Sequence, residues 1–196
     1  MSPKGRQQQR TRATVSTLLS SATRLFGERG YADTSLEDIA EDCGLTIGAI
    51  YHHFGNKKAL FGAVNEAVER RIIDAGEAIS DEDPGQMMQN RWRAFLALCD
   101  DPGFRRIVLV DSPHILGRDR WSSSEVTTRV AHSSLTAAAS NDPRHALTLR
   151  ILRGAMAEAA LALAEADNCE STRAQIDEII GRILSGVSAH LHSNPS

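Results

Sequence analysis

The sequence predicts an all-α fold, in which a small N-terminal three-helix unit precedes a larger helical domain, with about nine helices in all. Apolar residues recur at helical spacing along most of the chain, and no run alternates apolar and polar residues as a half-buried strand does. Acid–proline pairs at 83–84, 101–102 and 142–143 each place an N-cap carboxylate beside a proline suited to the first helical turn. These patterns favour helices throughout.

The composition is that of a globular protein without a membrane segment. The 196 residues are 41% hydrophobic and 24% charged, and no run of apolar residues is long enough to span a bilayer. The first residues lack the apolar core of a secretory signal. The three cysteines are an odd number and lie far apart, which favours reduced thiols over a disulfide framework. We therefore expect a cytoplasmic protein with no membrane partner.

The charge is distributed unevenly. The net charge is −3, yet residues 1–60 carry eight Lys and Arg against six Asp and Glu, and the first twelve residues carry no acid. Such asymmetry indicates that the N-terminal part meets an anion, although a solvated basic tail gives the same pattern. We expect residues 1–9 to form a disordered basic arm, with Arg10 and Arg12 beside it as candidate contacts.

The first two helices are marked by their stripes and ends. Residues 15–26 carry an apolar face that ends before Gly30, which suits a C-terminal cap. Thr34 and Glu37 fit a capping box at the start of a second helix, which ends at Gly44. The second helix buries its own apolar stripe, which consists of Leu36, Ile39, Ala40 and Cys43.

The remaining helices follow from similar signals. Thr46 is a candidate N-cap for a third helix to about Phe54, and Gly55 with Asn56 ends it and caps a fourth that runs to about Ile79. Residues 111–117 contain Pro113 and predict a break. The later helices are expected at about 86–99, 102–110, 119–140, 143–167 and 171–192.

The second and third helices form a helix-turn-helix candidate. Ala40 permits a close crossing, Gly44 suits the turn, and Ile50 anchors the third helix to the first two. On a helical wheel Ile47, Ile50 and Phe54 face inward, whereas Tyr51 and His52 lie opposite. Small residues and planar hydrogen-bonding side chains on that outward face suit an approach to the major groove of DNA.

Metal and enzyme chemistry fit the sequence poorly. His52 and His53 are adjacent, so their side chains diverge by about 100° and cannot chelate one ion, which on a helix needs i, i+4 spacing. Asp111, Ser112 and His114 have hydrolase residue types but lack a Gly-x-Ser-x-Gly elbow. We expect no catalytic residues, no metal and no cofactor.

The N-terminal segment closely resembles the DNA-binding domain of the TetR/AcrR family of bacterial transcriptional regulators. The resemblance covers about residues 10–62. Its motif positions are Ala22, Leu25, Phe26, Gly30, Tyr31, Thr34, Ile39, Ala40, Gly44 to Thr46, Ile50 to Phe54, Lys57 and Leu60. Beyond them, residues 106–117 and 155–166 are similar to C-terminal domains of one branch of the family. The implied organisation is a DNA-binding domain at 10–56 and an effector-binding and dimerisation domain at 57–196.

The resemblance also implies roles for single residues. One set would hold DNA phosphates, and it consists of Thr34, Thr46, Tyr51, His53 and Lys57. A second set would lie against base edges, and it consists of Gly48, Ala49 and His52. Ile47 departs from the polar or basic residue of many relatives and would instead meet a thymine methyl. The arm with Arg10 and Arg12 either adds phosphate or minor-groove contacts or stays disordered away from DNA.

For the C-terminal domain the resemblance implies an effector pocket and a homodimer. The candidate pocket residues, which plain core packing explains equally well, are Trp92, Phe95, Leu96, Phe104, His114, Leu116 and Trp121. The last two helices would form the subunit interface, unless both only complete the core of one protomer. The candidate interface residues are Ile151, Ala155, Ile176, Ile180, Ile183 and Val187.

We expect a sequence-specific DNA-binding regulator that acts as a homodimer on a palindromic double-stranded operator. By family resemblance it is a repressor, released when a small, mostly apolar effector moves the fourth helix and with it the recognition helices. The alternative is a helical protein-interaction module without DNA binding.

Overall fold

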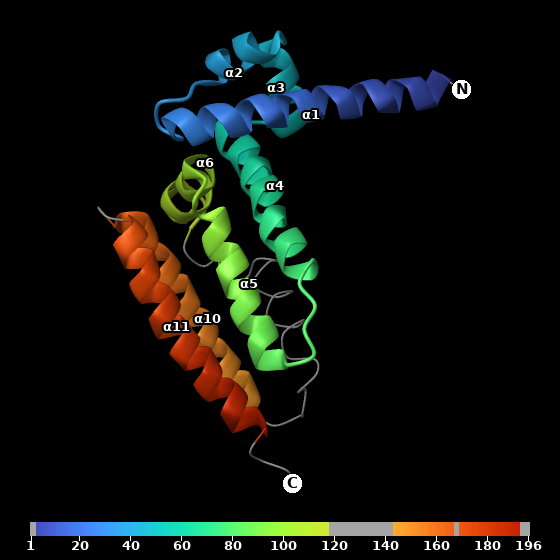
Figure 1. The fold of residues 1–196 in the computed structure, drawn as a ribbon. Coiled ribbons are helices and arrows are strands. Elements are labelled where there is room, and N and C mark those ends of the chain that lie inside the picture. Colours follow the sequence, from blue (N-terminus) through green and yellow to red (C-terminus); the bar gives the residue numbers. More distant parts are fainter. Residues whose placement is uncertain (1–2, 118–142, 167–168, 193–196) are drawn as a thin grey trace. The chain divides into compact units, whose positions relative to one another are not determined.

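The computed structural model describes residues 3–117, 143–166 and 169–192, and in these parts the chain is helical with no strand (Figure 1). The all-α prediction is confirmed. The N-terminal helices are α1 (Pro3–Arg29), α2 (Leu36–Cys43), α3 (Ile47–Phe54) and α4 (Lys57–Glu77). The following elements are α5 (Pro84–Leu98), α6 (Pro102–Phe104), the π-helix η1 (Arg105–Asp111), α7 (Ser112–Ile115), α10 (Pro143–Glu165) and α11 (Cys169–His192). Within the described ranges no helix is long and apolar enough to cross a membrane.

The described residues fall into two compact units. The first lies within Met1–Val68 and Pro102–Leu116, and the second within Glu69–Asp101 and Gly117–Ser196. These units differ from the sequence ranges 10–56 and 57–196, because the first half of α4 and the segment from α6 to α7 belong with α1.

Aromatic and aliphatic side chains form the core of the first unit. Phe26 of α1 meets Phe61 of α4 edge to face with ring centroids 5.2 Å apart, and Ile39 and Ile50 are fully buried. A Cβ added at Gly27 would lie only 3.1 Å from Cα of Gly103, so the glycine lets α6 cross α1 closely. The core thus fixes α2 and α3 on one side of α1.

In the second unit α5 and α10 both pack against α11, and Figure 1 shows α10 and α11 side by side. Trp92 stacks on Phe95 at 5.4 Å, and Leu184 of α11 is fully buried. Polar bridges join α5 to α11, since Nε2 of Gln89 donates to Oγ of Ser185 at 2.7 Å.

Three local predictions were wrong. α1 begins at Pro3, so the described part of the predicted arm is helical. The predicted break at 111–117 is helical as far as Ile115, because Pro113 falls in the first turn of α7, where a missing N–H is tolerated. The capping box of α2 is formed by Ser35 and Asp38 and not by Thr34 and Glu37. The helix predicted at 119–140 lies outside the described residues.

Candidate nucleic-acid interface

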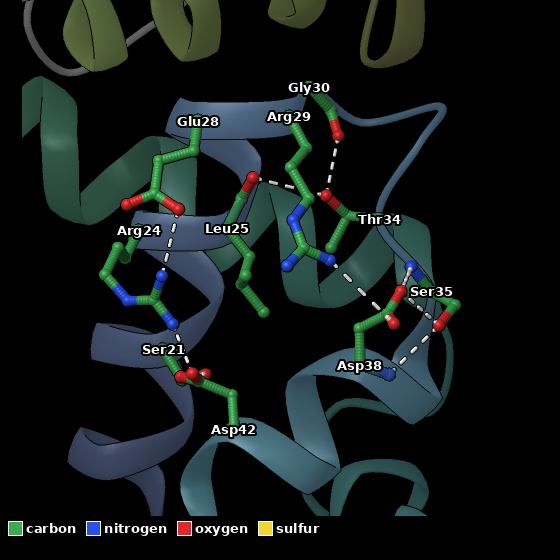
Figure 2. Close-up of polar contacts among 10 residues, drawn as sticks. All are labelled: Ser21, Arg24, Leu25, Glu28, Arg29, Gly30, Thr34, Ser35, Asp38 and Asp42. Atoms are coloured by element: carbon green, nitrogen blue, oxygen red, sulfur yellow. Dashed lines mark hydrogen bonds and ion pairs between the residues drawn. The ribbon is translucent and has the colours of Figure 1, made fainter.

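The start of α2 is fixed by a reciprocal capping box (Figure 2). The amide of Asp38 donates to Oγ of Ser35 at 3.0 Å, and the amide of Ser35 donates to Oδ2 of Asp38 at 2.8 Å. Hydrogen bonds from the hydroxyl and amide of Ser35 lower the pKa of the Asp38 carboxyl. The carboxylate therefore stays ionised and holds the first turn of α2 in place.

Thr34 serves the end of α1 and not the start of α2. Its side chain is 0% exposed, and its hydroxyl donates to the carbonyl oxygens of Gly30 at 2.8 Å and Leu25 at 3.3 Å (Figure 2). A helix end leaves such carbonyls without partners in the helix. The predicted phosphate contact through the Thr34 hydroxyl is wrong, because the hydroxyl is both buried and engaged.

Polar side chains link α1 to α2. Asp42 accepts a 2.5 Å hydrogen bond from Oγ of Ser21 and pairs with Arg24, which also pairs with Glu28 at 2.9 Å. Figure 2 shows this chain of side chains along α1. The ion pairs are partly exposed, so they contribute more to orientation than to the free energy of unfolding.

The turn between α2 and α3 has the predicted geometry. Gly44 adopts φ +65°, and the amide of Leu45 donates to the carbonyl of Ala40 at 2.9 Å. Oγ1 of Thr46 accepts from the amide of Ala49 at 3.3 Å and caps α3. Ile50 is fully buried, so the helix is anchored along one line and its opposite face is left outward.

The outward face of α3 carries the predicted contact residues together. Tyr51 is 55% exposed, and Thr46, Gly48 and His52 are also exposed. Ile47, Ala49 and His53 are half-buried at the edges of this face. A Cβ added at Gly48 would lie 3.7 Å from Oγ1 of Thr46, an ordinary contact, so nothing within the protein requires glycine there.

Lys57, in the first turn of α4, contacts the turn that follows α1. Its Nζ lies 4.3 Å from the ring centroid of Tyr31 and 3.4 Å from the carbonyl oxygen of Ala32. Partial burial raises the pKa of the Tyr31 phenol, which therefore stays neutral at physiological pH. Arg10 and Arg12 lie elsewhere, exposed on the N-terminal part of α1.

The two histidines do not form part of a metal cluster in the described ranges. The rings of His52 and His53 meet edge to face at 4.9 Å. Nowhere in those ranges do three His, Cys, Asp or Glu side chains gather as a metal site requires. His52 is exposed on the outward face of α3, and His53 is half-buried at its edge.

The predicted effector-pocket residues are divided between the units. Trp92, Phe95 and Leu96 are buried on α5, in the second unit. Phe104 is buried in the first unit, where His114 is exposed and Leu116 half-buried; Trp121 lies outside the described residues. The indole Nε1 of Trp92 is buried without a hydrogen-bond acceptor among the described residues.

The predicted dimer residues lie on two different faces of α10 and α11. Ile176 and Ile180 are buried within the second unit, which contradicts their predicted place on an intermolecular surface, whereas Ile183 is exposed. Ile151 is 64% exposed, and Ala155 and Val187 are half-buried. Leu147 and Ile179 extend the exposed apolar face. Each lies four residues before a predicted interface residue, Ile151 or Ile183, so the helical spacing would have identified them from the sequence.

Sequence reasoning assigned no role to several residues that shape the site. Ser35 has the same three-residue spacing to an acid as Thr34, so the capping pattern alone fits both registers. Arg106 and Asp111, which contact the end of α1 from η1, are far from it in sequence and carry no local signal.

Comparison with known proteins identifies both parts of the chain. Residues 18–64 match the model of bacterial regulatory proteins of the tetR family, and residues 86–187 match a tetracyclin repressor-like C-terminal domain. A crystal structure of a TetR-family transcriptional regulator from Pectobacterium atrosepticum is 33% identical, with a TM-score of 0.75 over 90% of this chain and 95% of that one.

Two regulators resemble the chain over shorter stretches. HTH-type transcriptional regulator TtgR of Pseudomonas putida is 36% identical over 106 residues, which are 52% of this chain and 50% of the relative. HTH-type transcriptional regulator AcrR of Shigella flexneri is 42% identical over 64 residues, or 33% of this chain and 30% of the relative. The chain thus spans about half the length of the first and about a third of the second.

Proposed function

We propose, from the premise that this chain belongs to the TetR family of bacterial transcriptional regulators, that it represses transcription from a palindromic operator until a small effector releases it. Family membership makes the protein a DNA-binding transcriptional regulator and not an enzyme. The observation that carries the operator proposal is the outward face of α3, where exposed Tyr51 and His52 lie opposite fully buried Ile50.

In the proposed complex α3 lies in the major groove. Gly48, Ala49 and His52 approach base edges, and Ile47 meets a thymine methyl. The surrounding phosphates are bound by the polar groups at both ends of α3 and at the start of α4, which are Thr46, Tyr51, His53 and Lys57. Arg10 and Arg12 add basic groups along α1.

Selection of bound duplexes from a random DNA pool tests this proposal. Two recognition helices related by two-fold symmetry should enrich a palindrome whose half-sites are about one helical turn or more apart. The matched variant is Tyr51→Ala, which removes an exposed side chain and should weaken binding to the enriched duplexes with an unchanged melting temperature. No enrichment by the unaltered protein would contradict operator binding and favour a protein-interaction module.

We further propose that α10 and α11 form the homodimer interface. Four of the six large apolar side chains exposed in the described residues lie on these two helices, namely Leu147, Ile151, Ile179 and Ile183. Water contact with such a face is unfavourable, and pairing two copies would contribute about 25 cal/mol of stabilisation per Å² of apolar area buried. Ala155 and Val187, both half-buried, lie at the edge of the proposed interface.

A charge on this face should separate the protomers. Ile179, 58% exposed, is changed to Asp, and the matched control is Ala174→Asp, an exposed position about 140° away around α11. Analytical ultracentrifugation should show a monomer for the first variant and a dimer for the second. A dimer that survives Ile179→Asp would place the interface elsewhere.

The effector that we propose is mostly apolar with one hydrogen-bond acceptor. Trp92, Phe95 and Leu96 present an apolar cluster on α5, and the buried Trp92 N–H lacks an acceptor among the described residues. Leaving such a donor unpaired costs about 1–3 kcal/mol, which an acceptor on a ligand would recover. The proposed pocket rests on this α5 cluster; Phe104, His114 and Leu116 lie in the other unit.

Pairs of aromatic ketones and the corresponding hydrocarbons test this chemistry. The ketone should raise the melting temperature more than the hydrocarbon and should weaken operator binding. Trp92→Phe, which keeps the ring and removes the donor, should erase the difference within each pair. An equal response of Trp92→Phe and the unaltered protein to the ketone would contradict the hydrogen bond.

A further inference from the structure

The ammonium group of Lys57 is already placed before any DNA is present. Its Nζ lies over the Tyr31 ring, 4.3 Å from the centroid, and 3.4 Å from the carbonyl oxygen of Ala32. A free lysine side chain has many rotamers, and ordering it in a complex costs free energy. A lysine side chain that is already ordered loses less conformational entropy when it binds a phosphate.

Tyr31 is in turn fixed from two sides. Its ring stacks on Phe26 with centroids 5.8 Å apart and meets the edge of Phe61 at 5.1 Å. Its main-chain N–H donates to Oδ2 of Asp111 at 2.8 Å. Tyr31, whose ring forms the platform beneath the Lys57 ammonium, is therefore attached both to the core of the first unit and to η1.

The π-helical register of η1 is what lets it hold this segment. The amide of Ser112 donates to the carbonyl of Ile107, five residues earlier, as in a π-helix. Residues five apart then lie nearly above one another, whereas an α-helix would turn them about 140° apart. Arg106 and Asp111 are such a pair, and the Arg106 guanidinium donates to the carbonyl of Glu28 at 2.5 Å.

Gly30 lies between these two side chains. It adopts φ +88°, and a Cβ added there would lie 3.6 Å from both Cδ of Arg106 and Oδ2 of Asp111. Arg106 also places a positive charge at the C-terminal end of α1, where the helix dipole favours it. Both ends of the turn from Glu28 to Tyr31 are thus bound by one face of η1.

We propose that Tyr31 is a positioning residue for the DNA contact of Lys57, and that η1 sets the strength of this contact through Asp111. The inference rests on the proposed function, because it requires Lys57 to bind a phosphate. A change of η1 from π to α register would turn Asp111 away from Tyr31 and leave the platform held only by its ring contacts. This route from η1 to the DNA passes through the turn after α1 and needs no displacement of α4.

Double-mutant cycles on a fluorescein-labelled duplex of mixed sequence test the first step, since phosphate contacts dominate such binding. Tyr31→Leu removes the aromatic face and should weaken binding by about two- to fivefold for each protomer on the DNA. Tyr31→Phe keeps the face and should bind like the unaltered protein. In the Lys57→Ala background Tyr31→Leu should have no further effect.

The second step uses Asp111→Ala, with Asp111→Asn as the control that keeps an oxygen acceptor for the Tyr31 amide. Asp111→Ala should weaken binding like Tyr31→Leu, and Lys57→Ala should again remove the effect. Urea denaturation of every variant shows whether it is folded. The two backgrounds separate the coupling from a general structural defect, because such a defect would weaken DNA binding equally with Lys57 and with Lys57→Ala. Equal weakening with and without Lys57 would overturn the inference, whereas an unaltered protein that fails to bind the duplex would overturn the proposed function.

Discussion

Gly48→Ala should stabilise the protein and weaken its binding to DNA. The new Cβ would lie 3.7 Å from Oγ1 of Thr46, which is an ordinary contact, and Gly48 has no positive φ that only glycine tolerates. Alanine in a helix is more favourable than glycine by about 0.5–1 kcal/mol, so the free energy of unfolding should rise by up to this amount. In the complex the methyl would occupy space between α3 and the bases, and overpacking costs about 1–3 kcal/mol.

The assay measures urea denaturation and operator affinity on the same preparation. The affinity loss corresponds to about 5- to 150-fold, which fluorescence anisotropy resolves readily. Gly76→Ala is the matched control, because a Cβ at Gly76 of α4 meets open space; it should be stabilising without changing affinity. Affinity that is unchanged or increased in Gly48→Ala would refute the close approach of α3 to DNA.

Three further changes separate stability from DNA contact. Thr34→Val should lower the free energy of unfolding by about 1–3 kcal/mol, because it leaves the Gly30 carbonyl without its hydroxyl donor, and should leave the salt dependence of operator affinity unchanged in a titration. Asp38→Asn should make the free energy of unfolding depend less on pH in acid, as measured by circular dichroism. Hydrogen bonds from Ser35 lower the pKa of the Asp38 carboxyl in the folded state below its usual value of 3.8. The stabilisation by the ionised carboxylate is therefore present above that pH and is lost as pH falls through the folded-state pKa. Tyr51→Phe, which removes only an exposed hydroxyl, should weaken operator binding in a gel-shift titration and leave the melting temperature unchanged.

Helix ends were predictable where the signal is local. Gly44 has the positive φ that its turn requires, and Thr46 caps α3 through its own hydroxyl. Asn56 likewise accepts from the amide of Ala59 at 2.8 Å and opens α4. Such caps depend on residues within about one turn of one another, so the amino-acid order contains the necessary information.

Choices that depend on tertiary contacts were not predictable from the same patterns. Thr34 and Ser35 both fit a capping box, and the decision came from the carbonyls at the end of α1, which engage the Thr34 hydroxyl. The apolar stripe of α11 is wide enough to serve two faces, and only packing shows that Ile180 turns inward and Ile179 outward. A pattern of apolar residues specifies that a face is buried, but not what buries it.

The contact between η1 and the end of α1 had no signal in the sequence at all. Asp111 and Tyr31 are separated by 80 positions, and a π-helical turn has no composition that distinguishes it from an α-helix. The contact between Lys57 and the ring of Tyr31 was similarly not predictable, because the two residues are 26 positions apart and belong to different elements. Both features depend on contacts between the turn after α1 and elements that are distant in the sequence, so only the folded structure shows them.

The dependence of operator affinity on salt tests the central claim, that the outward face of α3 and the start of α4 bind the DNA backbone. A logarithmic plot of the association constant against salt concentration should be a straight line of steep negative slope, because bound phosphates release counterions. Lys57→Ala should reduce the magnitude of this slope by about 1 for each protomer bound. A flat line, or a slope that Lys57→Ala leaves unchanged, would contradict the account.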